Sequence, residues 1–180
     1  MVELPDTPDR PLLIVGVGHS GTTLVARWAM ALGWDGLDAD TEYAESVTFR
    51  RFNEHLLKEG YLPSEVWTWA DMLPDAFVLK DPRLAVTLPF WRSVFVAAKR
   101  QPVLVWVYRP LEDVVASHRR RGRNVSEDPV IFGRPLSEHL HMIRLSWDSW
   151  PYGRVFIDMR HVARALSGFD PARLLQVESP

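Results

Sequence analysis

The stretch "PLLIVGVGHSGTTLVARWAMALG", residues 11–33, decides the fold. Its first part, residues 12–17, is a continuous apolar run rich in β-branched residues, which is typical of a strand buried on both faces of a parallel sheet. A glycine-rich turn follows, and residues 22–33 then show helical spacing of apolar residues up to a terminal glycine. The order strand, glycine turn, helix is that of a phosphate-binding loop.

The turn at residues 16–21, called the glycine loop below, departs from the usual nucleotide-binding motif. Gly16 and Gly21 keep the spacing of G-x-x-x-x-G-K-[ST], but Thr22 stands where the motif has lysine. The glycines let the backbone curl and aim N–H groups at an anion, and the next helix adds its positive end. Without the lysine, the loop lacks the charge that binds a β/γ-phosphate pair carrying Mg²⁺. A tight turn with no ligand is the alternative interpretation.

The rest of the chain alternates between strand and helix patterns. Buried strands are predicted at 12–17, 76–81, 102–109 and 154–159, and helices at 22–33, 45–60, 64–73, 89–99, 111–122, 137–150 and the start of 161–175. This alternation predicts one domain over residues 1–180, an α/β fold with three α/β/α layers around a mainly parallel sheet.

Polar clusters follow three of these strands, where α/β sheets bind their ligands. The clusters are "GHSGTT" at 18–23, "KDPR" at 80–83 and "YRP" at 108–110. Arg109 is followed eight residues later by Ser117, and a guanidinium with a hydroxyl can bind one phosphate. Alternatively, the arginine pairs with an acid of the following helix, and the serine faces solvent.

These segments together resemble the sulfotransferases that use 3′-phosphoadenosine 5′-phosphosulfate (PAPS), especially bacterial members. The similarity lies in "HSGTT" at 19–23, "ESVTFRRFNEHLL" at 45–57, "KDPRL" at 80–84 and "RPLEDVVAS" at 109–117. The order and spacing of all four agree between residue 12 and about residue 158. The resemblance implies a P-loop NTPase-like sulfotransferase fold, PAPS as donor, the bisphosphate nucleotide PAP as product, and no metal.

The resemblance also implies roles for individual residues. The 5′-phosphosulfate is expected on the glycine loop and the helix start, and the 3′-phosphate on Arg109 and Ser117. The loop residues that this assigns to the donor are Gly18, His19, Ser20, Gly21, Thr22 and Thr23. His19 replaces the lysine or arginine usual in the family, and adenine contacts are expected from elsewhere, for example residues 119–136.

The predicted reaction is in-line transfer of a sulfuryl group to a hydroxyl of a small molecule, carbohydrate or lipid. Such transfer needs a base for the acceptor proton and positive charge near the leaving oxygen. Glu45 is the predicted base, with Glu42 as the alternative. Lys80 and His19 are the candidates that stabilise charge on the bridging oxygen.

Two other functions compete with this interpretation. One is a P-loop kinase or hydrolase using ATP and Mg²⁺, with Asp81 or Asp158 as metal ligand. The other is a non-catalytic nucleotide-binding module. Trp67 and Trp69 are predicted as core residues or, alternatively, as a stacking platform for an acceptor. The remaining histidines are predicted to be surface or loop residues: His55, His118, His139, His141 and His161.

Composition restricts the partners. The chain is 47% hydrophobic and 24% charged, with a net charge of -2, so no basic field favours nucleic acid. No apolar run reaches the length of a membrane span, and the acidic, polar start is not a secretory signal, so a cytoplasmic location is expected. The chain has no cysteine. The oligomeric state is not indicated.

Overall fold

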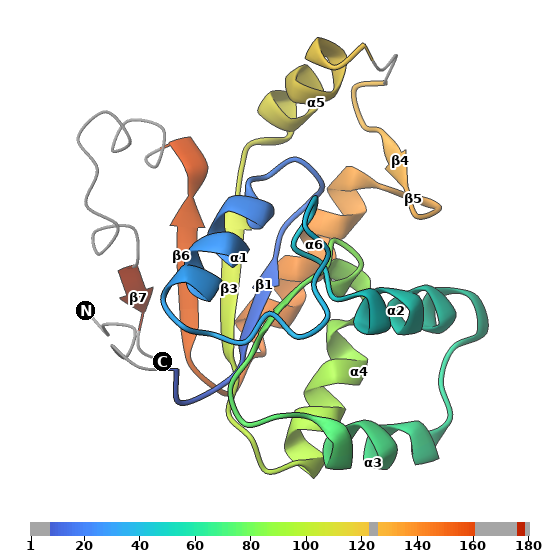
Figure 1. Ribbon diagram of the computed structural model, residues 1–180. Coiled ribbons are helices and arrows are strands. Elements are labelled where there is room, and N and C mark those ends of the chain that lie inside the picture. Colours follow the sequence, from blue (N-terminus) through green and yellow to red (C-terminus); the bar gives the residue numbers. More distant parts are fainter. Residues whose placement is uncertain (1–7, 123–125, 161–175, 179–180) are drawn as a thin grey trace.

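The computed structural model of the protein describes residues 8–122, 126–160 and 176–178 (Figure 1). Its central sheet has the strand order β2-β1-β3-β6-β7. The strands are β1 (Leu12–Val15), β2 (Val78–Lys80), β3 (Val103–Tyr108), β6 (Arg154–Asp158) and β7 (Gln176–Glu178). The first four in the sheet are parallel, and β7 pairs antiparallel with β6. The prediction of an α/β fold with a central parallel sheet is therefore confirmed; the fifth, antiparallel strand was not predicted.

Helices cover both faces of this sheet. They are α1 (Thr22–Ala31), α2 (Val47–Glu59), α3 (Pro63–Met72), α4 (Leu84–Ala97), α5 (Leu111–Arg120) and α6 (Leu136–Asp148). Apolar residues of α1 pack on one face, and residues of α2, α3, α4 and α6 pack on the other. Among the described residues, no helix has the length and apolar character needed to cross a membrane.

Strand β1 packs against helices on both faces of the sheet. Leu13 and Val15 pack with the larger helical layer, and Leu12 and Ile14 pack with the α1 layer. Side chains alternate between the faces of a strand, so an apolar residue at every position means that both faces are covered. All four are buried, which explains why this run has no polar residue.

Helix α4 begins five residues earlier than predicted. The sequence predicted a start at Pro89, but the helix starts at Leu84 and contains the proline in its interior. The Asp81 carboxylate accepts the Arg83 N–H at 2.8 Å and so begins the turn that opens the helix. Pro89 has no N–H to donate within the helix, and complete burial of Leu84 and other apolar residues of α4 offsets that loss.

A two-stranded hairpin of β4 (Val130–Ile131) and β5 (Arg134–Pro135) lies within residues 119–136, for which the sequence predicted no strand. Its turn residues, Phe132 and Gly133, have φ values of 51° and 77°. Two consecutive positive φ values are the mark of the type I′ turn, which matches the twist of antiparallel strands. The helix predicted at the start of 161–175 lies outside the described residues.

Candidate functional site

The carboxyl ends of β1, β2 and β3 meet at one edge of the sheet and carry the predicted polar segments. β1 pairs in parallel with β2 on one side and with β3 on the other. The next two strands of the sheet, β2 and β3, therefore lie on opposite sides of β1. Open α/β sheets bind ligands at such a point, where the strand order reverses. The glycine loop after β1 therefore lies between Lys80, at the end of β2, and Arg109, just after β3.

The glycine loop is packed so closely that two of its glycines are required. A Cβ on Gly16 would lie 2.7 Å from the Val107 carbonyl oxygen and 2.5 Å from Ser20 Oγ. Gly21 has φ of 100°, and a Cβ there would lie 2.6 Å from Met159 Cε. Side chains at either position would therefore strain the backbone or collide with β3 and the end of β6.

The start of α1 presents backbone hydrogen-bond donors with no acidic residue in its first turn. The helix begins at Thr22. The first amides of a helix have no partner within it and favour an anion. Ser20 is fully buried, yet its hydroxyl has no hydrogen-bond partner among the described residues. A buried hydroxyl left unpaired costs about 1–3 kcal/mol, a cost that a hydrogen bond to a ligand or to a water would remove.

The end of β3 brings the Arg109 guanidinium to the same loop, and helix α5 brings the His118 imidazole. Arg109 Nη1 donates to the His19 carbonyl oxygen at 3.1 Å, and no ion pair of Arg109 occurs in the described part of the chain. The ring centroid of His118 lies 4.0 Å from that of His19. Ser117, on the same helix, is partly buried and makes no hydrogen bond to Arg109 within the described residues. Their shared binding of one phosphate stays a prediction.

Lys80 and Glu45 form a buried ion pair on the other side of the loop. Lys80 Nζ lies 2.7 Å from Glu45 Oε1 and also donates to the Tyr43 carbonyl oxygen at 3.1 Å. Both side chains are buried. The structure therefore joins two residues, 35 positions apart in the chain, to which the sequence had assigned complementary roles.

Glu42, the alternative base, does not join this pair. It is exposed, and its backbone carbonyl oxygen accepts a hydrogen bond from Arg27 Nη2 at 3.0 Å. Glu45 instead lies just before α2, where Asp38 fixes the backbone. The Asp38 carboxylate accepts hydrogen bonds from the Ser46 hydroxyl and from the Thr48 N–H, the latter at 2.8 Å. The geometry selects Glu45 as the carboxylate that faces Lys80.

Arg83 extends the cluster with a second cation. Its Nη1 lies 3.0 Å from Asp81 Oδ1 and 3.7 Å from Glu45 Oε2, and its Nη2 lies 2.7 Å from Glu54 Oε1. The guanidinium carbon also lies 4.5 Å from the centre of the Phe132 ring. Carboxylates on three sides and an aromatic face on another fix this side chain beside the Lys80–Glu45 pair.

Asn53 anchors this cluster and was not predicted from the sequence. Its Nδ2 donates to Asp81 Oδ2 at 2.9 Å, and its Oδ1 accepts from Thr87 and Trp91 at 2.9 and 2.8 Å. Burial raises the pKa of Asp81, while Arg83 and the Asn53 amide act in the opposite direction. The only sign of this role in the sequence is that Asn53 is a polar residue on the predicted buried face of the helix at 45–60.

Asp81, which the ATP-based alternative needs as a metal ligand, is thus already engaged by protein donors. Asp158, the second candidate ligand, pairs with Arg160. Within residues 8–122, 126–160 and 176–178, no group of three or more His, Asp or Glu side chains is arranged to hold a metal ion.

The prediction for two histidines was wrong. His118 and His139 are 3% and 1% exposed, not surface residues. His139 stacks on Phe132, with ring centroids 6.2 Å apart, and burial lowers its pKa. His118 lies on α5 and His139 on α6, and the buried residues of both helices are mainly apolar. The helical period of apolar residues therefore gave no reason to expect a histidine on the buried face.

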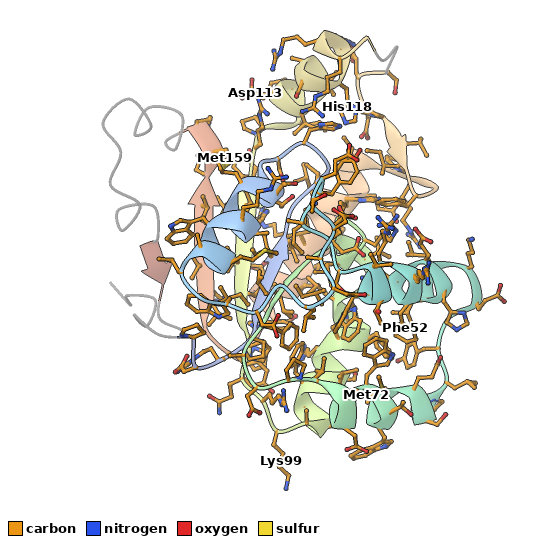
Figure 2. The ribbon with its side chains drawn as sticks, viewed as in Figure 1. Phe52, Met72, Lys99, Asp113, His118 and Met159 are labelled. Atoms are coloured by element: carbon orange, nitrogen blue, oxygen red, sulfur yellow. The ribbon has the colours of Figure 1, made fainter. Side chains whose placement is uncertain are left out.

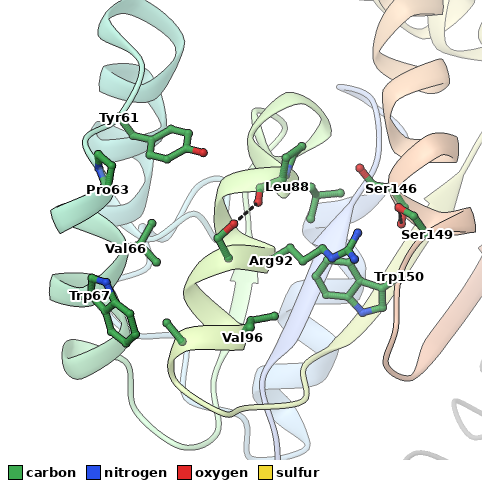
Figure 3. Close-up of a pocket in the computed structure, with 13 residues that line it drawn as sticks. Tyr61, Pro63, Val66, Trp67, Leu88, Arg92, Val96, Ser146, Ser149 and Trp150 are labelled. Carbon is green, nitrogen blue, oxygen red and sulfur yellow. Dashed lines mark hydrogen bonds between the residues drawn. The ribbon is translucent and has the colours of Figure 1, made fainter.

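The two tryptophans of α3 have different environments. Trp69 is partly buried and packs against Phe49 and Trp91 of the core. Trp67 is 63% exposed and lines a cavity of about 750 Å³ between α3, α4 and α6 (Figure 3). None of the predicted catalytic or donor-binding residues lines that cavity. A stacking role for Trp67 would therefore belong to a different surface from the glycine loop.

Comparison of the chain with protein-family models, curated proteins and solved structures finds no significant match.

Proposed function

We propose that the protein is a PAPS-dependent sulfotransferase with a P-loop-like fold. The observation that carries the proposal is the glycine loop, which lies between the Arg109 guanidinium on one side and the Lys80–Glu45 pair on the other. The loop contains the buried Ser20 hydroxyl, which has no hydrogen-bond partner among the described residues. Such an arrangement has an anion-binding centre with a cation and an acid–base pair on either side of it. A donor with two separated anionic groups and a hydroxyl acceptor would use all three parts.

The residues of the loop suit a phosphosulfate better than a magnesium-bound triphosphate. The amides at the start of α1, the Ser20 hydroxyl and the hydroxyls of Thr22 and Thr23 are neutral donors, which favour a group of modest charge. Arg109 and Ser117 would hold the 3′-phosphate, since a guanidinium binds phosphate through two N–H groups. When bound, the donor would supply the sulfuryl group that is transferred.

The chain itself would supply a base and a positive charge. Glu45 would accept the proton of the acceptor hydroxyl, and Lys80 would stabilise negative charge on the oxygen that leaves. His19, which is part of the glycine loop, would assist as a hydrogen-bond donor. Burial of the Lys80–Glu45 pair excludes water, which strengthens both electrostatic effects.

The acceptor has to bring a hydroxyl to Glu45. Arg83 and Phe132 border that carboxylate and offer a cation and an aromatic face to whatever approaches. A hydroxyl of a small molecule, carbohydrate or lipid remains the proposed acceptor class.

The test is calorimetric titration with adenosine 3′,5′-bisphosphate, with AMP and with ATP plus Mg²⁺. We expect the bisphosphate to bind more tightly than AMP. Arg109→Ala should weaken bisphosphate binding about 10- to 100-fold, since a hydrogen bond to a charged group contributes about 1.5–3 kcal/mol. The same change should affect AMP much less, because AMP lacks the 3′-phosphate. Arg92→Ala, in an exposed arginine of α4, is the matched control.

Preference for ATP with Mg²⁺ would replace the proposal with a nucleotide kinase or hydrolase. Equal losses for bisphosphate and AMP in Arg109→Ala would remove Arg109 from the 3′-phosphate. Tight bisphosphate binding without transfer from labelled PAPS to any hydroxyl acceptor in a screen would leave a nucleotide-binding module.

A further inference from the structure

The cavity between α3, α4 and α6 is a second hollow surface, apart from the candidate site. Figure 2 shows α3, with Met72 as its last residue, at the opposite end of the molecule from His118 of α5. Trp150 lines the cavity, and its Nε1 donates to the Pro102 carbonyl oxygen at 3.2 Å, directly before β3. The cavity therefore lies toward the amino ends of the strands, whereas the glycine loop lies at their carboxyl ends. The proposed reaction assigns this cavity no role.

The walls of the cavity expose large apolar side chains to water. Its volume of about 750 Å³ falls within the usual range of about 300–1,000 Å³ for small-molecule sites. Tyr61, Trp67 and Val96 line it, and each is more than half exposed. Covering such side chains with an apolar molecule is favourable, because it removes apolar area from water. Exposed apolar surface of this kind often marks a site of interaction.

The charged lining of the cavity, among the described residues, is one cation. Arg92 of α4 lines the cavity, and its guanidinium makes no ion pair or hydrogen bond within the part of the chain that the structure describes. The acids of the three helices do not line it: Glu65, Asp71, Glu138 and Asp148. The hydroxyls of Ser93 and Ser149 donate to carbonyl oxygens one turn earlier in the chain. Arg92 is therefore the group that would attract an anion into the cavity.

The indole of α3 and the guanidinium of α4 lie on different sides of the cavity. Figure 3 shows Trp67 on the α3 side, and the Arg92 side chain pointing from α4 toward Trp150 and the α6 side. A ligand that spans the cavity would therefore contact an aromatic face at one end and a positive charge at the other. That distribution fits a molecule with an apolar body and one anionic head.

We propose that this cavity binds an amphiphilic organic monoanion, such as a medium-chain carboxylate, with its apolar body against Trp67 and its negative charge at Arg92. The site goes beyond the proposed function and does not depend on it, because none of the predicted donor-binding or catalytic residues lines the cavity. One guanidinium matches one negative charge, so a multiply charged bisphosphate nucleotide is not the expected ligand. Arg92→Ala therefore remains a suitable control for the nucleotide titration at the glycine loop.

The experiment compares two probes that share one alkyl chain, decanoate and 1-decanol. Binding to the whole protein is measured by equilibrium dialysis, below the concentration at which either probe aggregates. Arg92→Ala should weaken decanoate binding about five- to thirtyfold, between the effects of an exposed ion pair and of a charge-assisted hydrogen bond. The same change should leave the affinity for decanol, which has no charge, within about twofold. Trp67→Ala should weaken the binding of both probes, because both place the chain against the indole.

Arg51→Ala changes an exposed arginine of α2 that does not line the cavity, and this control should behave as wild type. No saturable binding of decanoate by the wild-type protein overturns the inference. Equal losses of decanoate binding in Arg92→Ala and Arg51→Ala, or equal losses for decanoate and decanol in Arg92→Ala, also overturn it. Self-association of the wild-type protein in sedimentation, abolished by Trp67→Ala and without decanoate binding, would assign this surface to a second copy of the chain instead. None of these outcomes changes the test of the nucleotide site.

Discussion

Lys80 and Glu45 should be strongly coupled in the free energy of unfolding. The perturbation is a double-mutant cycle of Lys80→Met, Glu45→Gln and the two together. Lys80 is 5% and Glu45 7% exposed, so each single change leaves a buried charge with its main partner gone. Glu45 would keep only Arg83, at 3.7 Å, and Lys80 would keep only the Tyr43 carbonyl oxygen.

The size of the effect follows from the geometry. Two unit charges 2.7 Å apart attract by about 6 kcal/mol at an effective dielectric constant near 20, and desolvation offsets much of this attraction. Removing one partner of a buried pair costs about 3–5 kcal/mol, whereas replacing both with uncharged groups is often nearly neutral. We therefore expect the double variant to be more stable than either single variant, with a coupling energy of about 3 kcal/mol or more, at the upper end of the usual range for residues in contact.

The assay is urea unfolding followed by tryptophan fluorescence, which the eight tryptophans of the chain make sensitive. Unfolding midpoints and slopes of the four proteins give the coupling energy. Additive losses, with a coupling below about 0.5 kcal/mol, would mean that the ammonium and the carboxylate do not face each other in the folded protein. That result would also remove the proposed acid–base pair.

Three further predictions concern the loop, the turn before α2 and the reaction. Gly16→Ala should lower the free energy of unfolding by about 1–3 kcal/mol, because its Cβ meets the Val107 carbonyl oxygen, while Gly18→Ala, whose Cβ meets nothing closer than 3.7 Å, should change it little; equal thermal shifts would contradict this packing. At Asp38, burial works to raise the pKa, but the hydrogen bonds from Ser46 and Thr48 outweigh it and hold the pKa below its ordinary value. Asp38→Asn should therefore lower the melting temperature at neutral pH, and the difference should begin to shrink near pH 4, the ordinary pKa of aspartate, and disappear only below the lowered pKa of the folded state; a constant difference down to pH 3 would refute the role of the carboxylate. Glu45→Gln should cut turnover with an identified acceptor strongly and leave bisphosphate affinity near normal, and unchanged turnover would exclude Glu45 as base.

The sequence predicted the parts of the fold that depend on local pattern. The β1 run is apolar at every position because both faces of the strand are covered, and that pattern is visible without a structure. The glycine loop was equally visible, since close approach of Val107 and Met159 leaves room only for hydrogen at Gly16 and Gly21. The "KDPR" segment at a strand end and Glu45 just before a helix were recognisable as polar groups, and the structure brings Lys80 and Glu45 into contact.

Long-range contacts were less visible. Asn53 looks like an ordinary helical residue until Asp81, Thr87 and Trp91 converge on it from other parts of the chain. His118 likewise acquires meaning only when α5 brings it to His19. Such partners are set by how elements pack, which neither helical period nor residue type specifies.

The β4–β5 hairpin contacts both the glycine loop and the Arg83 side chain next to Glu45. Ile131 Cδ1 lies 3.7 Å from the position of a Cβ on Gly18, and the next residue, Phe132, lies under the Arg83 guanidinium. A molecule that shifted this turn on entering beside the loop would also shift the surface next to Glu45. For the proposed donor and acceptor, steady-state kinetics with varied concentrations of both would then show sequential rather than independent binding.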